Sequence, residues 1–206
     1  CEEGMEERTV LVSGHSKSYA MNGWRLGWAA LPTAAEAKVF KQLNINVVSC
    51  VPPFVQEAGR EAYENPESQR VVDDMVAAFQ RRRDWIVPAL NAIPGVRCQN
   101  PKGAFYVFPN VAGICEELGV VDAWEAMAPE ARARTSPSGM LQMFLLYRYG
   151  VATMDRNSFG AIGAEGQHYL RLSIATSLEN CKKGVGRMAE AATDRDGFAR
   201  FLEEVA

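Results

Sequence analysis

Several features that would point to a special environment or partner are scarce in this sequence of 206 residues. No apolar run reaches the ~18 residues that a membrane-spanning helix needs, so we expect no membrane span. The 22 basic residues are outnumbered by 25 acidic ones, for a net charge of -3, and this balance predicts no nucleic-acid partner. There are only two histidines and no Cys-x-x-Cys pair, so no metal site is expected.

The cysteines are few and widely separated. They are odd in number, which argues against a disulfide framework, and stand at Cys1, Cys50, Cys98, Cys115 and Cys181. Reduced thiols fit a cytoplasmic protein best, and we expect that location. Residues 1–10 are acidic and lack an apolar core, so we do not expect them to be a secretory signal.

What remains is the composition of an ordinary globular protein, with 48% hydrophobic and 23% charged residues. Short β-branched and apolar runs predict strands at 9–12, 24–31, 95–98, 104–108, 151–154 and 169–175. Helical spacing predicts helices at 33–47, 54–63, 67–91, 114–118, 138–149 and 177–206, the last interrupted near Gly197. Thr33 and Glu36 have the spacing of a capping box. The mixture of strands and helices predicts an α/β fold.

A domain boundary is predicted at Pro66, where a long helical pattern begins. Residues 1–66 have the pattern of the end of an α/β layer. Residues 67–206 alternate helix and short strand, as in a smaller α/β or α+β domain.

The most informative stretch is Ser13–Trp28. Lys17 lies in a Gly- and Ser-rich loop between two runs that are predicted to be buried strands, and Arg25 follows eight residues later. A loop amine of this kind can form a Schiff base with a phosphorylated aldehyde, while Arg25, hydroxyls and backbone N–H groups hold the phosphate. On spacing alone, however, solvated surface charges are the commoner role for two such cations.

Arg171 is the second candidate, because it lies in the strand pattern Tyr169–Ala175 with apolar neighbours on both sides. In a half-buried strand it shares a face with Ser173. A guanidinium there needs a partner, and its planar fork matches a carboxylate in a bidentate manner. From the strand alone, a salt bridge to an acid of the protein is as good an explanation as a bound substrate.

A longer pattern resembles a known family. The lysine signature of the class I/II aminotransferases is similar to Ser16-Lys17, Tyr19, Met21, Gly23-Trp24-Arg25, Gly27 and Trp28. The resemblance implies that Lys17 forms the internal aldimine with pyridoxal 5'-phosphate and that Arg25 binds the cofactor phosphate. Many members carry Ser where this chain has Gly14, so a phosphate contact there would come from the backbone N–H. Ser16 is a weaker candidate for the same phosphate.

Three further segments extend the resemblance. Arg171-Leu172-Ser173-Ile174-Ala175 resembles the R-L-S-x-A pattern of the family, which implies that Arg171 binds the substrate carboxylate. Gly103–Pro109 resembles a strand of the family's small domain. Phe159-Gly160 resembles the F-G pair before the last strand. Members often carry Pro-Gly shortly before that pair, whereas this chain has Met154-Asp155-Arg156-Asn157, so its loop beside the substrate is expected to differ.

The fold implied is the C-terminal part of the fold type I pyridoxal-phosphate transferases: the end of a large mixed-sheet α/β/α domain followed by a small α/β domain. The implied function is transfer of an amino group between an L-amino acid, of the aspartate type, and a 2-oxo acid. Lys17 would be the general base, and the enzyme a homodimer.

The resemblance covers only the C-terminal half or so of a family member. The Asp on the ring nitrogen, the Tyr on the ring oxygen and the stacking aromatic are expected upstream of Cys1, so we expect the 206-residue chain alone to be inactive. Two alternatives stay open: a pyridoxal-phosphate-dependent β-lyase on the same fold, and a non-catalytic truncated fragment.

Overall fold

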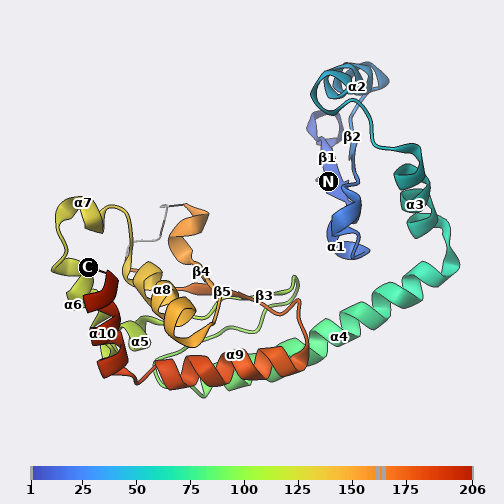
Figure 1. Cartoon of the computed structure of the whole chain (residues 1–206). Helices are drawn as coiled ribbons and strands as arrows, with labels where there is room; N and C mark the ends of the chain where they lie inside the picture. Colours follow the sequence, from blue (N-terminus) through green and yellow to red (C-terminus); the bar gives the residue numbers. More distant parts are fainter. Residues whose placement is uncertain (1, 161–162, 164–165, 206) are drawn as a thin grey trace. The chain divides into compact units, whose positions relative to one another are not determined.

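The computed structural model describes residues 2–160, 163 and 166–205 (Figure 1). It divides into two compact units, Cys1–Val76 and Ala77–Ala206. The boundary predicted at Pro66 coincides with the first residue of helix α4 (Pro66–Asn91), and the two units divide further along this helix. As a functional boundary, Pro66 stays a prediction.

The first unit combines a two-stranded antiparallel ribbon with helices. Its elements before α4 are η1 (Glu6–Arg8), β1 (Leu11–Gly14), α1 (His15–Ser18), η2 (Asn22–Trp24), β2 (Gly27–Ala30), α2 (Ala34–Val48) and α3 (Pro53–Glu64). The ribbon pairs Leu11 with Ala30 at one end and Gly14 with Gly27 at the other.

The second strand is shorter than the sequence pattern predicted. The run 24–31 was expected to be a strand throughout, but β2 begins only at Gly27. The backbone N–H of Trp24 donates to the carbonyl of Met21 and closes the turn η2, and Arg25 then adopts a left-handed conformation with φ 54°. Neither conformation is compatible with an extended strand.

Two further expectations for this segment were wrong. Lys17 does not lie in a loop but on the short helix α1. The strands were predicted to be buried, yet Leu11 is 53% and Val12 72% exposed, and within the described residues β1 pairs with no strand other than β2.

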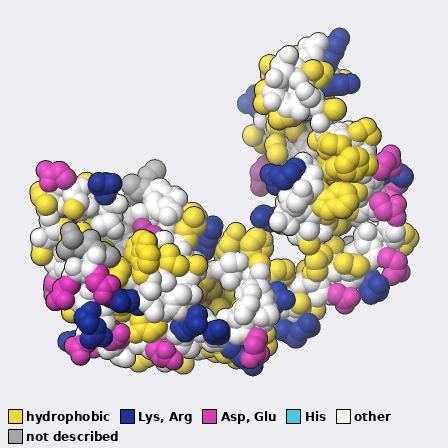
Figure 2. Space-filling view, viewed as in Figure 1, with side chains coloured by type: hydrophobic (Ala, Val, Ile, Leu, Met, Phe, Trp, Pro, Cys, Tyr) yellow, Lys and Arg dark blue, Asp and Glu magenta, His cyan; other side chains and the backbone are white. Residues whose placement is uncertain are grey.

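Helix α2 confirms the predicted capping box. The backbone N–H of Glu36 donates to the Thr33 hydroxyl, and the Glu36 carboxylate accepts from the Thr33 backbone N–H at 3.0 Å. The apolar stripe of the helix is nevertheless exposed, with Val47 at 79%. Figure 2 shows apolar side chains gathered on the surface of this unit, and those of α2 include Val39, Phe40, Leu43, Ile45, Val47 and Val48.

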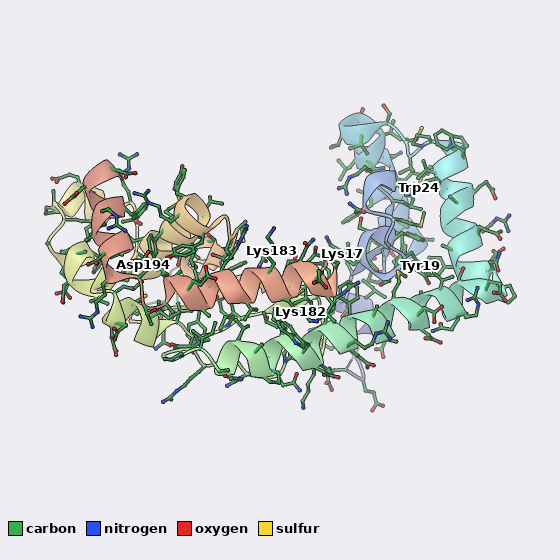
Figure 3. All side chains as sticks on the ribbon, turned by 60° about the horizontal axis from the view of Figure 1, so that its bottom comes forward. Lys17, Tyr19, Trp24, Lys182, Lys183 and Asp194 are labelled. Carbon is green, nitrogen blue, oxygen red and sulfur yellow. The ribbon has the colours of Figure 1, made fainter. Side chains whose placement is uncertain are left out.

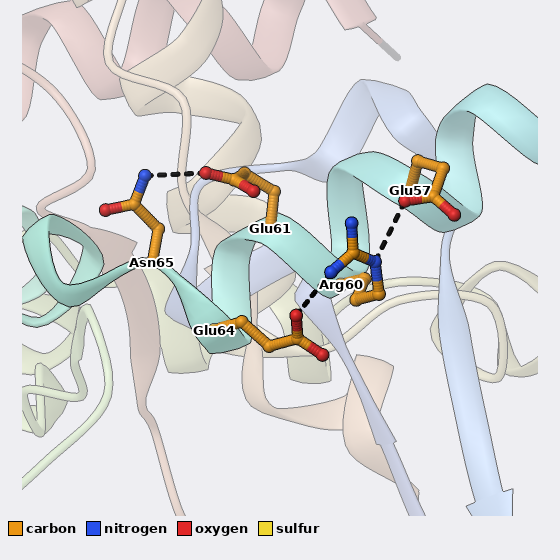
Figure 4. A network of polar contacts seen from close by, with 5 residues as sticks. All are labelled: Glu57, Arg60, Glu61, Glu64 and Asn65. Carbon is orange, nitrogen blue, oxygen red and sulfur yellow. Dashed lines mark hydrogen bonds and ion pairs between the residues drawn. The ribbon is translucent and has the colours of Figure 1, made fainter.

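Helix α3 carries charged pairs on its exposed face (Figure 4). Arg60 pairs with Glu57, where Nε and Oε2 are 2.9 Å apart, and also with Glu64. These hydrogen bonds raise the pKa of Arg60. The Asn65 amide donates to Glu61 Oε1 at 2.6 Å. Pairs at i,i+3 and i,i+4 stabilise a helix locally, and exposed pairs contribute little to global stability.

The long helix predicted at 67–91 is confirmed as α4 and passes through Pro88 without ending. A proline inside a helix removes one hydrogen bond and costs about 3 kcal/mol. Ile86, Val87 and Leu90, on either side of Pro88, are buried in the core of the second unit, and this burial offsets the cost.

The second unit packs helices around a three-stranded antiparallel sheet in the order β3-β5-β4. Its strands are β3 (Tyr106–Val107), β4 (Met154–Asp155) and β5 (Leu170–Ser173). After α4 its helices are α5 (Ala112–Glu117), α6 (Val120–Glu125), α7 (Pro129–Arg132), α8 (Pro137–Tyr149), η3 (Arg156–Phe159), α9 (Leu178–Ala191) and α10 (Arg195–Val205). Leu170 and Leu172 of β5 and Phe144 of α8 lie in its core.

Several strands are shorter than predicted. Residues 104–108 yield only the two residues of β3, and 151–154 only the start of β4. The run 95–98 contributes a single bridge between Arg97 and Asn110. β-branched and aromatic residues are typical of buried, extended backbone in general. Only the residues that form hydrogen bonds with a neighbouring strand belong to the sheet, so the strands are shorter than the pattern predicts.

The C-terminal helix is interrupted near Gly197, as predicted, although not at the glycine itself. The break lies at residues 192–194, and Gly197 is inside α10. The Asp194 carboxylate accepts from the Gly197 backbone N–H at 2.9 Å, which satisfies one of the unpaired donors of the first turn. A capping carboxylate, not the glycine, sets the break. Ala206, to which the helix was predicted to extend, lies outside the described residues.

Asp194, labelled in Figure 3, also links α10 to the end of α8, because the Tyr149 hydroxyl donates to its Oδ2 at 2.6 Å. Burial and this hydrogen bond raise the pKa of Tyr149 to about 12. The same bond, with that from the Gly197 N–H, lowers the pKa of Asp194. The depressed pKa means that the stabilisation is present above the unfolded pKa of Asp and is lost as the pH falls through the folded value.

We therefore expect Tyr149→Phe to lower the unfolding free energy at pH 7 by about 1 kcal/mol, the contribution of one hydrogen bond. The difference from the unsubstituted chain should shrink as the pH falls below the ordinary pKa range of Asp and through the lowered pKa of folded Asp194. Urea unfolding at pH 7 and pH 3 measures both. Tyr147→Phe is the matched control, since Tyr147 is exposed and makes no hydrogen bond to a described residue. A difference independent of pH would contradict the role of the Asp194 charge.

Candidate active site

The β1–β2 ribbon fixes the place of Lys17. Gly14 pairs with Gly27 at the end of the ribbon, and the backbone N–H of His15 donates to the carbonyl of Leu26 at 3.1 Å. A side chain at Gly27 would bring its Cβ to 3.0 Å from the carbonyl oxygen of Ser13, so glycine permits this close pairing. The helix that carries Lys17 therefore starts directly where the ribbon ends.

Within α1, Ser16 is half-buried and the Lys17 side chain is exposed. The backbone N–H of Ala20 donates to the carbonyl of Lys17, and Tyr19 and Met21 donate to that of His15. These bonds close the short helix and turn the chain towards η2. Figure 3 labels Lys17 together with Tyr19 and Trp24 of the same unit.

Arg25 lies at the same end of the ribbon, between η2 and β2. Its φ of 54° is unusual for a residue with a side chain and costs on the order of 1 kcal/mol. Its guanidinium is exposed and donates from Nη1 to the carbonyl of Asn22 at 3.1 Å. No carboxylate among the described residues pairs with it, so this cation has donors available for an anion.

His15 underlies this end of the ribbon. It is only 3% exposed, and neither ring nitrogen has a hydrogen-bond partner among the described residues. Its ring packs edge-on against Tyr63, with centroids 4.8 Å apart, and against Tyr19 at 5.5 Å. Tyr63 in turn accepts a hydrogen bond from Trp28 Nε1 at 2.8 Å. His15 therefore has a packing role, and its ring holds the start of α1 against Tyr63 of α3.

The residues present fit a phosphorylated aldehyde such as pyridoxal phosphate. An exposed primary amine, Lys17, and an arginine without an acidic partner, Arg25, lie at one end of one ribbon, beside the backbone of Gly14 and the Ser16 hydroxyl. An amine is the nucleophile that an aldehyde requires, and a guanidinium matches a phosphate.

Arg171 belongs to the second unit, on the central strand β5. Leu170 and Leu172 are buried on one face of the strand, so Arg171 and Ser173 point to the other, as predicted. The salt bridge that the sequence left open is not formed with any described residue. The guanidinium instead lies between two rings, with Cζ 4.2 Å from the centroid of Tyr106 and 4.7 Å from that of Phe159.

A third contact holds the same guanidinium. Arg171 Nη2 lies 2.9 Å from Met154 Sδ, and Met154 pairs with Arg171 across the β4–β5 ladder. Aromatic faces attract a cation without neutralising it. The contacts from Tyr106, Phe159 and Met154 therefore orient a planar cation that keeps its charge for a carboxylate.

Sequence reasoning missed this set of contacts. The sequence places Tyr106 only within the strand predicted at 104–108, and Phe159 only within the Phe-Gly pair. Alternation along residues 104–108 was the available signal for Tyr106, because it sets Tyr106 on the face opposite buried Val107. The register that pairs Tyr106 with Ser173 could not be predicted from the sequence.

The structure thus brings Gly14, Ser16, Lys17 and Arg25 to one end of the ribbon in the first unit, and Arg171 lies in the second. Across the described residues, no group of three or more His, Cys, Asp or Glu side chains is arranged to hold a metal ion. No helix in this part of the chain is long and apolar enough to cross a membrane.

Solved structures with the same fold are aminotransferases. The aromatic aminotransferase of Pyrococcus horikoshii superposes with a TM-score of 0.76 at 29% identity, covering 95% of this chain and 46% of that one. The aspartate aminotransferase of Rhizobium meliloti has a TM-score of 0.73 at 32% identity, covering 93% and 43%. The fold class expected from the sequence is confirmed.

The sequence comparisons agree with the fold. The family model of class I and II aminotransferases matches residues 1–188, and the chain belongs to that family. It is 39% identical over 183 residues to a probable aspartate/prephenate aminotransferase of Aquifex aeolicus, and 34% identical over 195 residues to an aspartate aminotransferase of Musicola paradisiaca. These matches cover 89% and 95% of this chain but only 41% and 42% of the relatives, so the chain spans less than half their length.

The packing role of His15 predicts how it responds to substitution. His15→Phe keeps the ring and removes two unpaired buried nitrogens, so the unfolding free energy of the first unit should change by less than about 1 kcal/mol. His15→Ala leaves a cavity and should cost about 3 kcal/mol. Urea unfolding followed by the fluorescence of Trp24 and Trp28 measures both variants. Equal losses in the two would show that the nitrogens, not the ring, matter.

Proposed function

We propose that this chain is the part of an aminotransferase that carries the covalent lysine and the substrate arginine, and that it moves an amino group between an L-amino acid of the aspartate type and a 2-oxo acid. The observation that carries the proposal is the placement of exposed Lys17 and acid-free Arg25 at one end of the β1–β2 ribbon. Family membership and the aspartate and aromatic aminotransferases among its relatives support the same reaction.

Lys17 and Arg25 have different roles in binding the cofactor. When bound, pyridoxal phosphate supplies an aldehyde for the lysine amine and a ring that withdraws electrons from the substrate Cα. Arg25 binds the phosphate, with the backbone N–H of Gly14 and the Ser16 hydroxyl as further donors. With the cofactor bound, the Lys17 amine would serve as the general base that takes the proton from the substrate Cα.

Arg171 acts on the substrate. The guanidinium is oriented by Tyr106 and Phe159, and no acid in the described part of the chain neutralises it. A substrate α-carboxylate can therefore bind to it through two parallel hydrogen bonds. This contact fixes the direction of the bond between Cα and its proton, which has to point to the base for transfer.

We further propose that the chain functions within a longer polypeptide and as a homodimer in the cytoplasm. The chain spans less than half of its relatives' length. The apolar residues exposed on β1, β2 and α2 support this proposal, because exposed apolar patches often mark surfaces that bind other protein. By itself, the 206-residue chain is expected to bind the cofactor weakly and not to turn over.

The covalent role of Lys17 is testable by chemical trapping. In the full-length polypeptide loaded with pyridoxal phosphate, borohydride reduction should attach the cofactor irreversibly to Lys17, as mass spectrometry of the peptides detects. Lys17→Ala should abolish the adduct and lower kcat at least about 10³-fold. Lys41→Ala, at an exposed lysine of α2, is the control and should change neither. An adduct on another lysine in the unsubstituted protein would refute the assignment.

Transfer and elimination are separated by their products. With an amino-acid donor and 2-oxoglutarate, we expect glutamate to form in proportion to the donor consumed. A β-lyase would instead release pyruvate and ammonia from a β-substituted amino acid, and neither product would depend on 2-oxoglutarate. Elimination without transfer would replace the proposed reaction by the lyase.

Arg171→Ala should raise the KM of α-carboxylate substrates at least about 10-fold.

A further inference from the structure

A buried carboxylate that the proposed reaction does not use follows Met154, the residue that pairs with Arg171 across the β4–β5 ladder. Asp155 of β4 is only 9% exposed, and no Lys, Arg or His among the described residues forms an ion pair with it. Its carboxylate accepts instead from two serine hydroxyls, Ser138 at 2.5 Å and Ser136 at 3.0 Å. Both serines are buried, Ser138 completely.

These serines belong to the start of α8. Ser136 is the N-cap, and its hydroxyl oxygen accepts from the backbone N–H of Gly139 at 2.9 Å. The N-terminus of a helix favours a negative charge, which helps to explain how a carboxylate is tolerated here without a cation. The backbone N–H of Asp155 donates to the Gln142 side chain at 2.6 Å, so a second turn of α8 also holds this residue.

Asp155 therefore fastens a short segment to α8, and that segment carries two of the three contacts of Arg171. Successive residues of a strand point to opposite faces, so the burial of Asp155 turns Met154 to the face of Arg171. The turn η3 follows immediately and ends at Phe159, whose ring lies 4.7 Å from the guanidinium carbon. β4 itself has only two residues and pairs with β5 alone, which is a weak hold without the carboxylate.

The segment contains no proline, whose ring would stiffen the backbone. Here Met154-Asp155-Arg156-Asn157 occupies that stretch, and hydrogen bonds to a buried carboxylate provide the stiffness. Asp155 also uses its backbone N–H, which a proline does not have.

We propose that Asp155, held by Ser136 and Ser138, is a positioning residue for the substrate-binding guanidinium of Arg171. It acts through Met154 and Phe159 and touches neither the cofactor nor the reacting atoms. This inference rests on the proposed role of Arg171. It adds that the affinity for the substrate carboxylate is set in part by a buried acid at the start of α8.

The test uses the holoenzyme and the substitution Asp155→Asn, which keeps the size of the side chain but replaces one accepting oxygen by an NH₂ group that cannot accept from a serine. KM for an α-carboxylate substrate should rise about 10-fold, with kcat and the affinity for pyridoxal phosphate changed less than about 2-fold. Ser138→Ala removes one hydroxyl and should have the same effect in smaller measure, which keeps the test decisive if Asp155→Asn folds poorly. Asp122→Asn, at an exposed acid of α6, is the control.

A purely structural role is excluded by a double-mutant cycle. If Asp155 acts through Arg171, then Asp155→Asn should raise KM no further in an Arg171→Ala background. A lowered melting temperature with KM unchanged, or the same rise in KM with and without Arg171, would overturn the inference. Failure of the proposed function is a separate result: Arg171→Ala would then leave the KM of carboxylate substrates unchanged.

Discussion

Alternation along β5 is the constraint on which the second unit depends. Leu170 and Leu172 point into the core, and this burial turns Arg171 to the opposite face between two other strands. Shifting the strand by one residue would bury a guanidinium and expose two leucines, at a cost comparable with the roughly 5–15 kcal/mol that separate folded from unfolded protein. The direction of the candidate substrate arginine is therefore fixed by the packing of its neighbours, and the surrounding rings and sulfur only refine it.

The first unit follows a different logic, because backbone geometry more than burial places its side chains. Glycine at 14 and 27 lets β1 and β2 approach closely, and the left-handed turn at Arg25 ends η2 so that β2 starts where it does. Lys17 and Arg25 are both exposed, and what relates them is the ribbon between them. The cations proposed to bind one phosphorylated aldehyde thus depend on two glycines and one strained residue.

Sequence reasoning recovered most helices, the family and the capping box at Thr33, because these are written in local spacing. It failed where the structure depends on which strands pair with each other. The strand lengths around Tyr106 and Met154 depend on which partners come into register, and no local pattern encodes that. The helix at Lys17 was read as a loop because four residues are too few for a periodicity. The stretch that contains Asp155 was expected to be unusual, but no local pattern indicates the role of its carboxylate, since its two serine partners are 17 and 19 residues away in the sequence.

The exposed ribbon of the first unit has a practical consequence. Within the described residues, β1 pairs only with β2, so each strand has one edge with unpaired backbone groups, and Leu11 and Val12 offer apolar side chains on both faces. Such edges recruit strands from other molecules. We therefore expect molecules of this chain, prepared by itself, to associate through their ribbons as the concentration rises. Low solubility would then limit the concentration at which activity can be assayed.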